Sequence, residues 1–163
     1  MRRIAIATAA LAALVALAFG AAPAYAQSGH FVTGGGNAPE CTDIGTQVSC
    51  DVKVAGLGGT TFEITVEASG VASVECTNPG GNVAPGQDTE VNAAGSSGEI
   101  PTPRNGSFTF RDLTTVAPTV PNTPTCPNPQ WSATVVDVAF ASPATLTLFE
   151  DGQVSDTIEV PIT

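Results

Sequence analysis

The chain has 163 residues, with 17 glycines, 13 prolines, four cysteines and a formal net charge of −10. A single domain of this length has a real hydrophobic core, because folding hides roughly two thirds of the unfolded surface. The acidic charge repels phosphate backbones and anionic lipid headgroups, so it argues against nucleic-acid binding and membrane-surface binding.

The first 26 residues have the pattern of an export signal. Arg2 and Arg3 precede an apolar run over 4–19, and Ala24-Tyr25-Ala26 supplies the small–x–small pattern that a signal peptidase cuts after. The apolar run is too short to hold a membrane by itself. We therefore expect a secreted, extracellular protein with no membrane span after cleavage.

The mature chain is expected to start near Gln27, with a glycine-rich lead-in over 27–40 and a β-sandwich domain over 41–163. It keeps three strong cations (Lys53, Arg104 and Arg111) against all fifteen carboxylates, which gives a net charge of −12. Such a charge keeps a secreted protein soluble and favours a monomer.

The composition of the mature chain predicts an all-β fold. Turn formers recur about every eight to twelve residues, with β-branched residues between them. The apolar spacing of an amphipathic helix is not found.

The clearest strand patterns lie at 47–54, 61–68 and 72–77, where apolar and polar residues alternate. Residues 56–59 turn the chain after the first segment, and Ser69-Gly70 breaks the pattern between the other two. We therefore expect three strands of an antiparallel meander with one solvated face.

Residues 78–86 hold too many glycines and prolines for a strand interior, and a weakly patterned segment follows at 89–91. Asn105-Gly106 is a strong hairpin-turn signal, after which Phe108 and Phe110 face inward. Residues 118–129 are rich in proline and are expected to run extended over the surface.

The longest apolar strand is expected at 131–140. Its inward face changes parity partway, which predicts a bulge near Val136-Asp137. Residues 144–150 and 154–162 then form a hairpin. Seven or eight strands without a substantial helix favour an immunoglobulin-like antiparallel β-sandwich, with a β-barrel as the alternative.

Four cysteines in an exported chain predict disulfides, at Cys41, Cys50, Cys76 and Cys126. No pair has the close spacing of a zinc knuckle. Three pairings are possible, and we favour Cys41–Cys50, which closes a short loop, and Cys76–Cys126, which joins two distant strands. In the chain-entropy model these closures contribute about 2.7 and about 4 kcal/mol.

Two segments resemble a pattern in small secreted proteins of high-GC Gram-positive bacteria that are generally uncharacterised. They are Cys76-Thr-Asn-Pro-Gly-Gly-Asn-Val-Ala-Pro-Gly-Gln87 and Cys126-Pro-Asn-Pro-Gln-Trp131. The resemblance covers 71–140, supports pairing Cys76 with Cys126 and implies no activity or site.

In composition the chain also resembles the enediyne-carrying apoproteins of actinomycetes, which are acidic, secreted sandwiches with two disulfides. The motifs of that family do not match, and the Cys76–Cys126 span is longer than its second disulfide loop. The resemblance implies a small-molecule carrier as an alternative function.

The sequence offers no catalytic constellation, and we expect no catalytic, cofactor-binding or metal-binding residues. His30 is the only histidine, and it lies in the glycine-rich lead-in, where we expect it to be solvated. Most carboxylates occupy outward strand positions. Asp137 lies inside an apolar strand, where a bulge or an edge is expected to let its carboxylate reach water.

Calcium and carbohydrate sites are also disfavoured. Three acidic pairs lie in loops, but none follows the twelve-residue calcium-loop pattern: Glu40 with Asp43, Asp88 with Glu90, and Glu150 with Asp151. A sugar site usually needs exposed aromatic platforms, and the mature chain has one tryptophan, no tyrosine and six phenylalanines, mostly at core-facing positions.

We therefore expect a secreted, non-enzymatic binding or structural module whose contact regions are 78–87 and 118–129, since sandwiches carry recognition on their loops. Its partner, an extracellular protein or a small molecule, is not defined by the sequence. The alternatives are the small-molecule carrier, a hydrolase, and a protease inhibitor that uses the loop over 42–49.

Overall fold

The computed structural model describes residues 28–163, so the expected export signal lies outside the described residues. Eight strands have four or more residues, and β1, β5 and β7 are shorter. The strands are β1 His30–Phe31, β2 Glu40–Asp43, β3 Val48–Ala55, β4 Thr61–Thr77, β5 Val83–Pro85, β6 Thr89–Ser96, β7 Ile100–Pro101, β8 Ser107–Thr114, β9 Ser132–Phe140, β10 Ala144–Glu150 and β11 Gln153–Val160. Two single helical turns, η1 Gly35–Asn37 and α1 Asn122–Thr125, lie in the connections.

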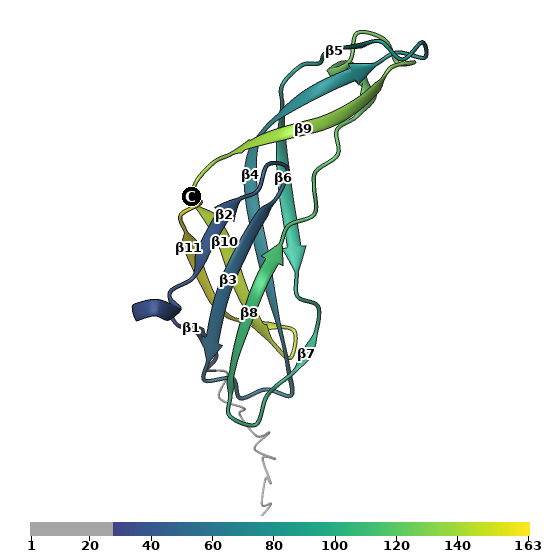
Figure 1. Cartoon of the computed structure of the whole chain (residues 1–163). Helices are drawn as coiled ribbons and strands as arrows, with labels where there is room; N and C mark the ends of the chain where they lie inside the picture. The colour runs from purple at the N-terminus through teal and green to yellow at the C-terminus, as the bar shows by residue number, and fades with distance from the viewer. Residues whose placement is uncertain (1–27) are drawn as a thin grey trace, which may run out of the picture.

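The strands form two antiparallel sheets that pack as a β-sandwich, without closing into a barrel over residues 28–163 (Figure 1). In the four-stranded sheet, β3 is central, with β8 on one edge and β1 and β2 on the other. In the seven-stranded sheet, β4 pairs along one edge with β10 and then β9, and along the other with β7, β6 and β5; β11 extends the sheet beyond β10. The predicted sandwich is confirmed.

β4 is one strand of 17 residues, so the predicted break at Ser69-Gly70 is wrong. A Cβ atom on Gly70 would lie 2.7 Å from the Ala139 carbonyl oxygen and 2.8 Å from Val138 Cγ1. The glycine therefore allows the backbone of β9 to approach closely, which is a recognised use of glycine inside a strand. It does not end the strand.

The predicted meander is also wrong, because β3 and β4 belong to different sheets. Residues 56–59 carry the chain from one sheet to the other and do not form a hairpin. Alternation alone cannot distinguish these cases, since the inward faces of two packed sheets show the same period as two neighbouring strands.

The sandwich has a large core and a small one. Sixteen buried residues from both sheets form the main core, including Phe62, Ile64 and Leu146. Ala72, Val74, Val91 and Val138 form the second cluster. We call the part around the main core the body. We call the extension the part formed by the second half of β4 with β9, β5, the start of β6 and residues 116–126.

The extension is covered by a proline-rich segment in place of a second sheet. Val120 packs against the second cluster, and residues 117–120 lie beside Ala133 and Val135 of β9. Figure 1 shows β4 and β9 continuing past β3 and β8, with the connection after β8 running alongside. We call residues 116–126 the covering segment.

Several local predictions are confirmed. Val136 is the extra residue of a bulge in β9, because Ser73 pairs with Asp137 while Val74 pairs with Val135. β10 and β11 form the expected hairpin. Residues 78–86 are mostly loop, but Val83–Pro85 forms a short edge strand on β4.

The glycine-rich lead-in contributes to the body. His30 and Phe31 form β1, which pairs with Val54 and Ala55 of β3, and Phe31 is buried in the main core. A turn lies at Asn105-Gly106, but the predicted hairpin is wrong, because β7 before it pairs with β4 and β8 after it pairs with β3 in the other sheet. Phe108 and Phe110 of β8 are half-buried against the main core.

Candidate functional site

The first predicted contact region and the second half of the other meet at one end of the molecule. Figure 1 shows β5 and the segment around α1 together at the far end of β4 and β9. The Cys76–Cys126 disulfide joins them, with 50 residues between the two cysteines in sequence. The backbone N–H of Gln87 also donates to the carbonyl oxygen of Thr125 at 3.0 Å. We call this surface, residues 78–87 and 122–129, the tip; residues 118–121 lie beside β6 and β9, away from the end.

Both disulfides follow the predicted pairing. Cys41 and Cys50 are directly opposite each other on β2 and β3, with Cα atoms 4.1 Å apart. Cys76 lies on β4 and Cys126 follows α1, with Cα atoms 5.8 Å apart. The first disulfide stabilises the body, and the second fixes the tip to the sheet.

Asparagine side chains hold the loops of the tip in place. Asn78 Oδ1 accepts a hydrogen bond from the Asn82 N–H at 2.9 Å. Asn122 Oδ1 accepts from Ala133 N–H at 2.9 Å. Asn128 Oδ1 accepts from Gln130 N–H at 2.9 Å. These bonds are local or reach an adjacent strand, so they hold the loops of the tip in one conformation.

The tip contains no ionisable side chain apart from the disulfide cysteine, although the chain as a whole is strongly acidic. Its exposed side chains include Val83, which is 57% exposed, together with Asn82, Gln87 and Pro127. Depletion of charge is what distinguishes the centre of protein interfaces from other surface. The charge-free stretches at 76–87 and 113–136 are visible in the sequence, and together they include all residues of the tip.

The single histidine and the strand carboxylates considered for catalysis lie on outward faces of the sandwich. His30 is exposed on β1, and its Nδ1 lies 3.0 Å from the Ser28 carbonyl oxygen. Glu63, Glu67 and Glu75 occupy alternate positions of β4 that face away from the core. Asp137 is exposed next to the bulge, as expected.

The three acidic pairs weighed for calcium, which the sequence disfavours, are not part of a metal-binding group in residues 28–163. Residues 28–163 hold no group of three or more His, Cys, Asp or Glu side chains that could bind a metal ion. Glu150 and Asp151 bind different parts of the chain. Asp151 Oδ1 accepts from Thr60 Oγ1 at 2.6 Å and from Thr61 N at 3.0 Å, and these bonds lower the pKa of the Asp151 carboxyl.

Glu150 is a structural residue whose role the sequence does not predict. It is fully buried at the end of β10, in line with Ala144, Leu146 and Leu148 on the inward face. Its position in that alternation was the signal available in the sequence.

The Glu150 carboxylate joins three segments of the body. Oε1 accepts from Gly58 N at 2.7 Å and from Gly59 N at 3.2 Å. Oε2 accepts from Gly29 N at 2.9 Å and from Ser155 Oγ at 2.8 Å. Burial acts to raise the pKa of the Glu150 carboxyl, but the four donors outweigh it and hold the pKa below its ordinary value.

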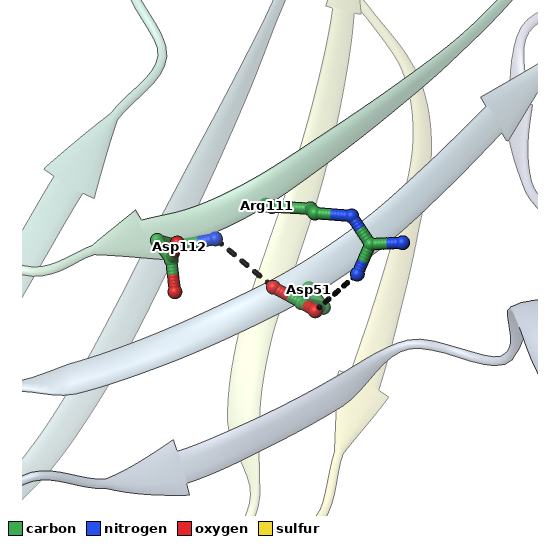
Figure 2. A network of polar contacts seen from close by, with 3 residues as sticks. All are labelled: Asp51, Arg111 and Asp112. Carbon is green, nitrogen blue, oxygen red and sulfur yellow. Dashed lines mark hydrogen bonds and ion pairs between the residues drawn. The ribbon is translucent and has the colours of Figure 1, made fainter.

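An ion pair lies on the outer face of the body. Figure 2 shows Asp51 accepting from Arg111 Nη1 at 3.3 Å and from the Asp112 backbone N–H at 2.9 Å. No other salt bridge is found among residues 28–163. A register shift after Cys50 allows one carboxylate to face two residues of β8.

The loop proposed for protease inhibition lies against β9. Ile44, at 52% exposed, is its most open apolar side chain, and Ile44 N–H donates to the Gln47 carbonyl oxygen at 2.9 Å. The Gly45 carbonyl oxygen accepts from Val138 N–H at 3.1 Å. This turn therefore connects the body to the extension.

The aromatic residues do not form an exposed platform in residues 28–163. Phe31 and Phe62 are buried, and the remaining phenylalanines and Trp131 are half-buried. Within the same residues, no helix is long and apolar enough to cross a membrane. Comparison with models of known protein families and with curated proteins finds no match for this chain.

Proposed function

We propose that this chain is a secreted, immunoglobulin-like β-sandwich that acts as a non-enzymatic extracellular binding module and contacts its partner through the tip. The observation that carries the proposal is the meeting of two distant loops in one uncharged surface. A disulfide and a set of asparagine hydrogen bonds hold that surface rigid, so little conformational entropy is lost when a partner binds.

Export is supported by two features. The first 26 residues have the pattern of a signal peptide, and the structure pairs all four cysteines in disulfides, which persist in oxidising compartments. The exposed position of His30 and the outward-facing carboxylates of β4 support binding over turnover.

The charge distribution supports a partner that meets the tip by shape and hydrogen bonding. The body is acidic and strongly hydrated, whereas the tip offers valine, proline and amide side chains. Amide groups such as those of Asn82 and Gln87 can both donate and accept hydrogen bonds. A folded extracellular protein presents complementary apolar and amide groups.

The test is an affinity capture with the exported chain as bait and the culture medium of the producing organism as source. Val83→Asp places a charge on the tip, and Val154→Asp places the same charge on β11 of the body. The two valines are matched, at 57% and 59% exposed on edge strands. We expect the wild type and Val154→Asp to capture the same partner and Val83→Asp to lose it.

Capture by both variants alike would contradict the assignment of the tip. Turnover of an ester, peptide or glycoside panel that is lost on mutating one carboxylate would overturn the non-enzymatic proposal. Thermal unfolding of both variants is the control for folding.

A further inference from the structure

The outer edge of β6 has backbone hydrogen-bonding groups without partners. β6 pairs with β4 along its other edge. The Ala94 carbonyl oxygen accepts from Val116 N–H at 2.8 Å, so the backbone groups of Ala94 point away from β4. Because these groups alternate along a strand, those of Asn92 and Glu90 point the same way. Within residues 28–163, no backbone or side-chain group bonds to them.

The covering segment begins to pair with this edge and then departs. After Val116, the next backbone nitrogen that faces β6 belongs to Pro118. Proline has no N–H to donate. The covering segment meets the residues before β6 again where Gln87 N–H donates to the Thr125 carbonyl oxygen. Between these two points lies a groove of about 540 Å³. Its lining comprises Thr89, Glu90, Val91, Asn92 and Ala94 of β6 and residues 116–121 of the covering segment.

We propose that this groove is a docking site for an extended peptide segment of a partner protein, which adds to β6 as a further strand. Strand addition to an exposed edge gives affinity through backbone hydrogen bonds and specificity through alternate side chains. The unpaired groups of Glu90 and Asn92 require an extended chain. The covering segment, which lacks the Pro118 N–H, cannot supply the missing bonds.

The side chains around the edge define the chemistry of this peptide. Glu90 is the one charged residue in the lining, and it is exposed on the outer face of the sheet. Val91 and Val120 lie on the inner side, next to the second cluster. An incoming strand therefore carries a basic residue toward Glu90 and small apolar residues at the alternate positions.

A second copy of this chain is a poor occupant. Two identical acidic edges would place Glu90 of each copy near the same interface, in proteins that each carry a net charge of −12. Like charges across a strand pair are destabilising. Charge complementarity favours a cationic peptide.

The probe is a capped peptide of alternating lysine and valine, titrated into the isotopically labelled exported chain. We expect saturable binding that shifts the amide signals of Glu90 and Asn92 and slows their hydrogen exchange. A glutamate–valine peptide of equal length should bind at least about tenfold more weakly, since the sign of its charge is reversed.

Two variants separate edge pairing from simple contact. Asn92→Pro removes an outward N–H while leaving the pairing with β4 intact, and Asn92→Ala keeps that N–H. We expect the first to weaken binding about tenfold and the second to have a much smaller effect, because only the first removes the backbone donor. If Asn92→Pro fails to fold, two N-methylated peptides make the same test, one methylated on its odd residues and one on its even residues. Only one of these sets of N–H groups faces β6, so one of the two peptides should lose binding.

Equal affinity for Asn92→Pro and Asn92→Ala, retained binding by both N-methylated peptides, or no saturable binding would overturn the proposal. Dimerisation of the wild type that is lost in Asn92→Pro would assign the edge to a second copy and would also overturn it. Val83→Asp, at the tip, should leave peptide binding unchanged, so this site and the tip are tested separately.

Discussion

In the body, two sheets face each other across sixteen buried residues, whereas in the extension one sheet faces a proline-rich segment across four. Burial of a valine or leucine side chain contributes about 1.5–3 kcal/mol. The body can therefore be held by apolar packing, while the small cluster of the extension contributes far less. The extension instead depends on the Cys76–Cys126 disulfide, which fixes the covering segment over the sheet.

One continuous strand, β4, contributes to both regions. The first half of β4, with Phe62 and Ile64, belongs to a well-packed core. The second half carries the tip beyond that core, where fewer contacts are made. The tip thus projects from the sandwich and is held by a disulfide where apolar packing is sparse.

The disulfides give the largest expected difference between the two regions. All four sulfurs are buried, so replacement by serine places matched hydroxyl groups in both regions. In the chain-entropy model, Cys76→Ser with Cys126→Ser costs about 4 kcal/mol, and Cys41→Ser with Cys50→Ser costs about 2.7 kcal/mol. Urea unfolding measures both free energies. A larger loss from the Cys41–Cys50 pair would contradict the role given to the tether.

Hydrogen exchange shows which strands lose stability when the Cys76–Cys126 disulfide is removed. Without the Cys76–Cys126 disulfide, amides of β5 and β9 should exchange faster, while those of β3 keep their protection, because the main core does not depend on the tether. Uniform loss of protection across both regions would show that body and extension unfold together.

Glu150→Gln tests how a buried polar group stabilises the body. In the wild type, hydrogen-bond donors surround the Glu150 carboxylate. The variant places an NH₂ group, itself a donor, among them, so we expect a loss of about 1–3 kcal/mol in the free energy of unfolding. Glu159→Gln, an exposed change on β11, is the control and should have almost no effect. Equal stability of the two variants would show that the four bonds to Glu150 are dispensable.

The stability difference between wild type and Glu150→Gln should depend on pH. Because the pKa of Glu150 is lowered in the fold, its contribution is fully present above the ordinary carboxyl pKa and is lost as pH falls through the folded pKa. The stability difference between wild type and Glu150→Gln should therefore shrink from about pH 7 to about pH 3. A difference that grew in acid would contradict the sign of this pKa shift.

Gly70→Ala tests the junction between body and extension. The added methyl group would overlap Ala139 and Val138 of β9, so we expect a loss of about 1–3 kcal/mol, as for overpacking in a core. Gly34→Ala is the matched control, because its Cβ meets nothing within 4 Å. Thermal unfolding compares them, and similar midpoints would show that β9 can shift without cost.

The ion pair on the outer face of the body gives the smallest expected effect. Arg111 and Asp51 side chains are 76% and 47% exposed, so Asp51→Asn should cost about 0.2–1 kcal/mol. Asp51→Ala also removes the acceptor for Asp112 N–H and should cost more. Urea unfolding at low and high salt checks both, and a loss for Asp51→Asn well above 1 kcal/mol would contradict a solvent-screened pair.

The alternation of residue types was enough to predict most strands and the cysteine pattern favoured the observed pairing. Even the bulge at Val136 followed from a change of parity, because a strand with one buried face must insert a residue to keep its apolar side chains inward. Local geometry fixes these features, so they can be predicted from residues close together in the sequence.

Long-range packing decided what alternation could not. Gly70 was interpreted as a strand break because a sequence does not show that β9 lies against it. The structural role of Glu150 is not predictable from the sequence, because its donors, Gly29 and Gly58, come from distant segments.

For the site, the sequence determined two proline- and glycine-rich loops and a disulfide that could join them. The tertiary structure alone decided that these loops form one surface, and that Pro118 leaves the edge of β6 open. The physical reason is that strand pairing depends on which backbone groups face each other, and this is set by the whole sandwich.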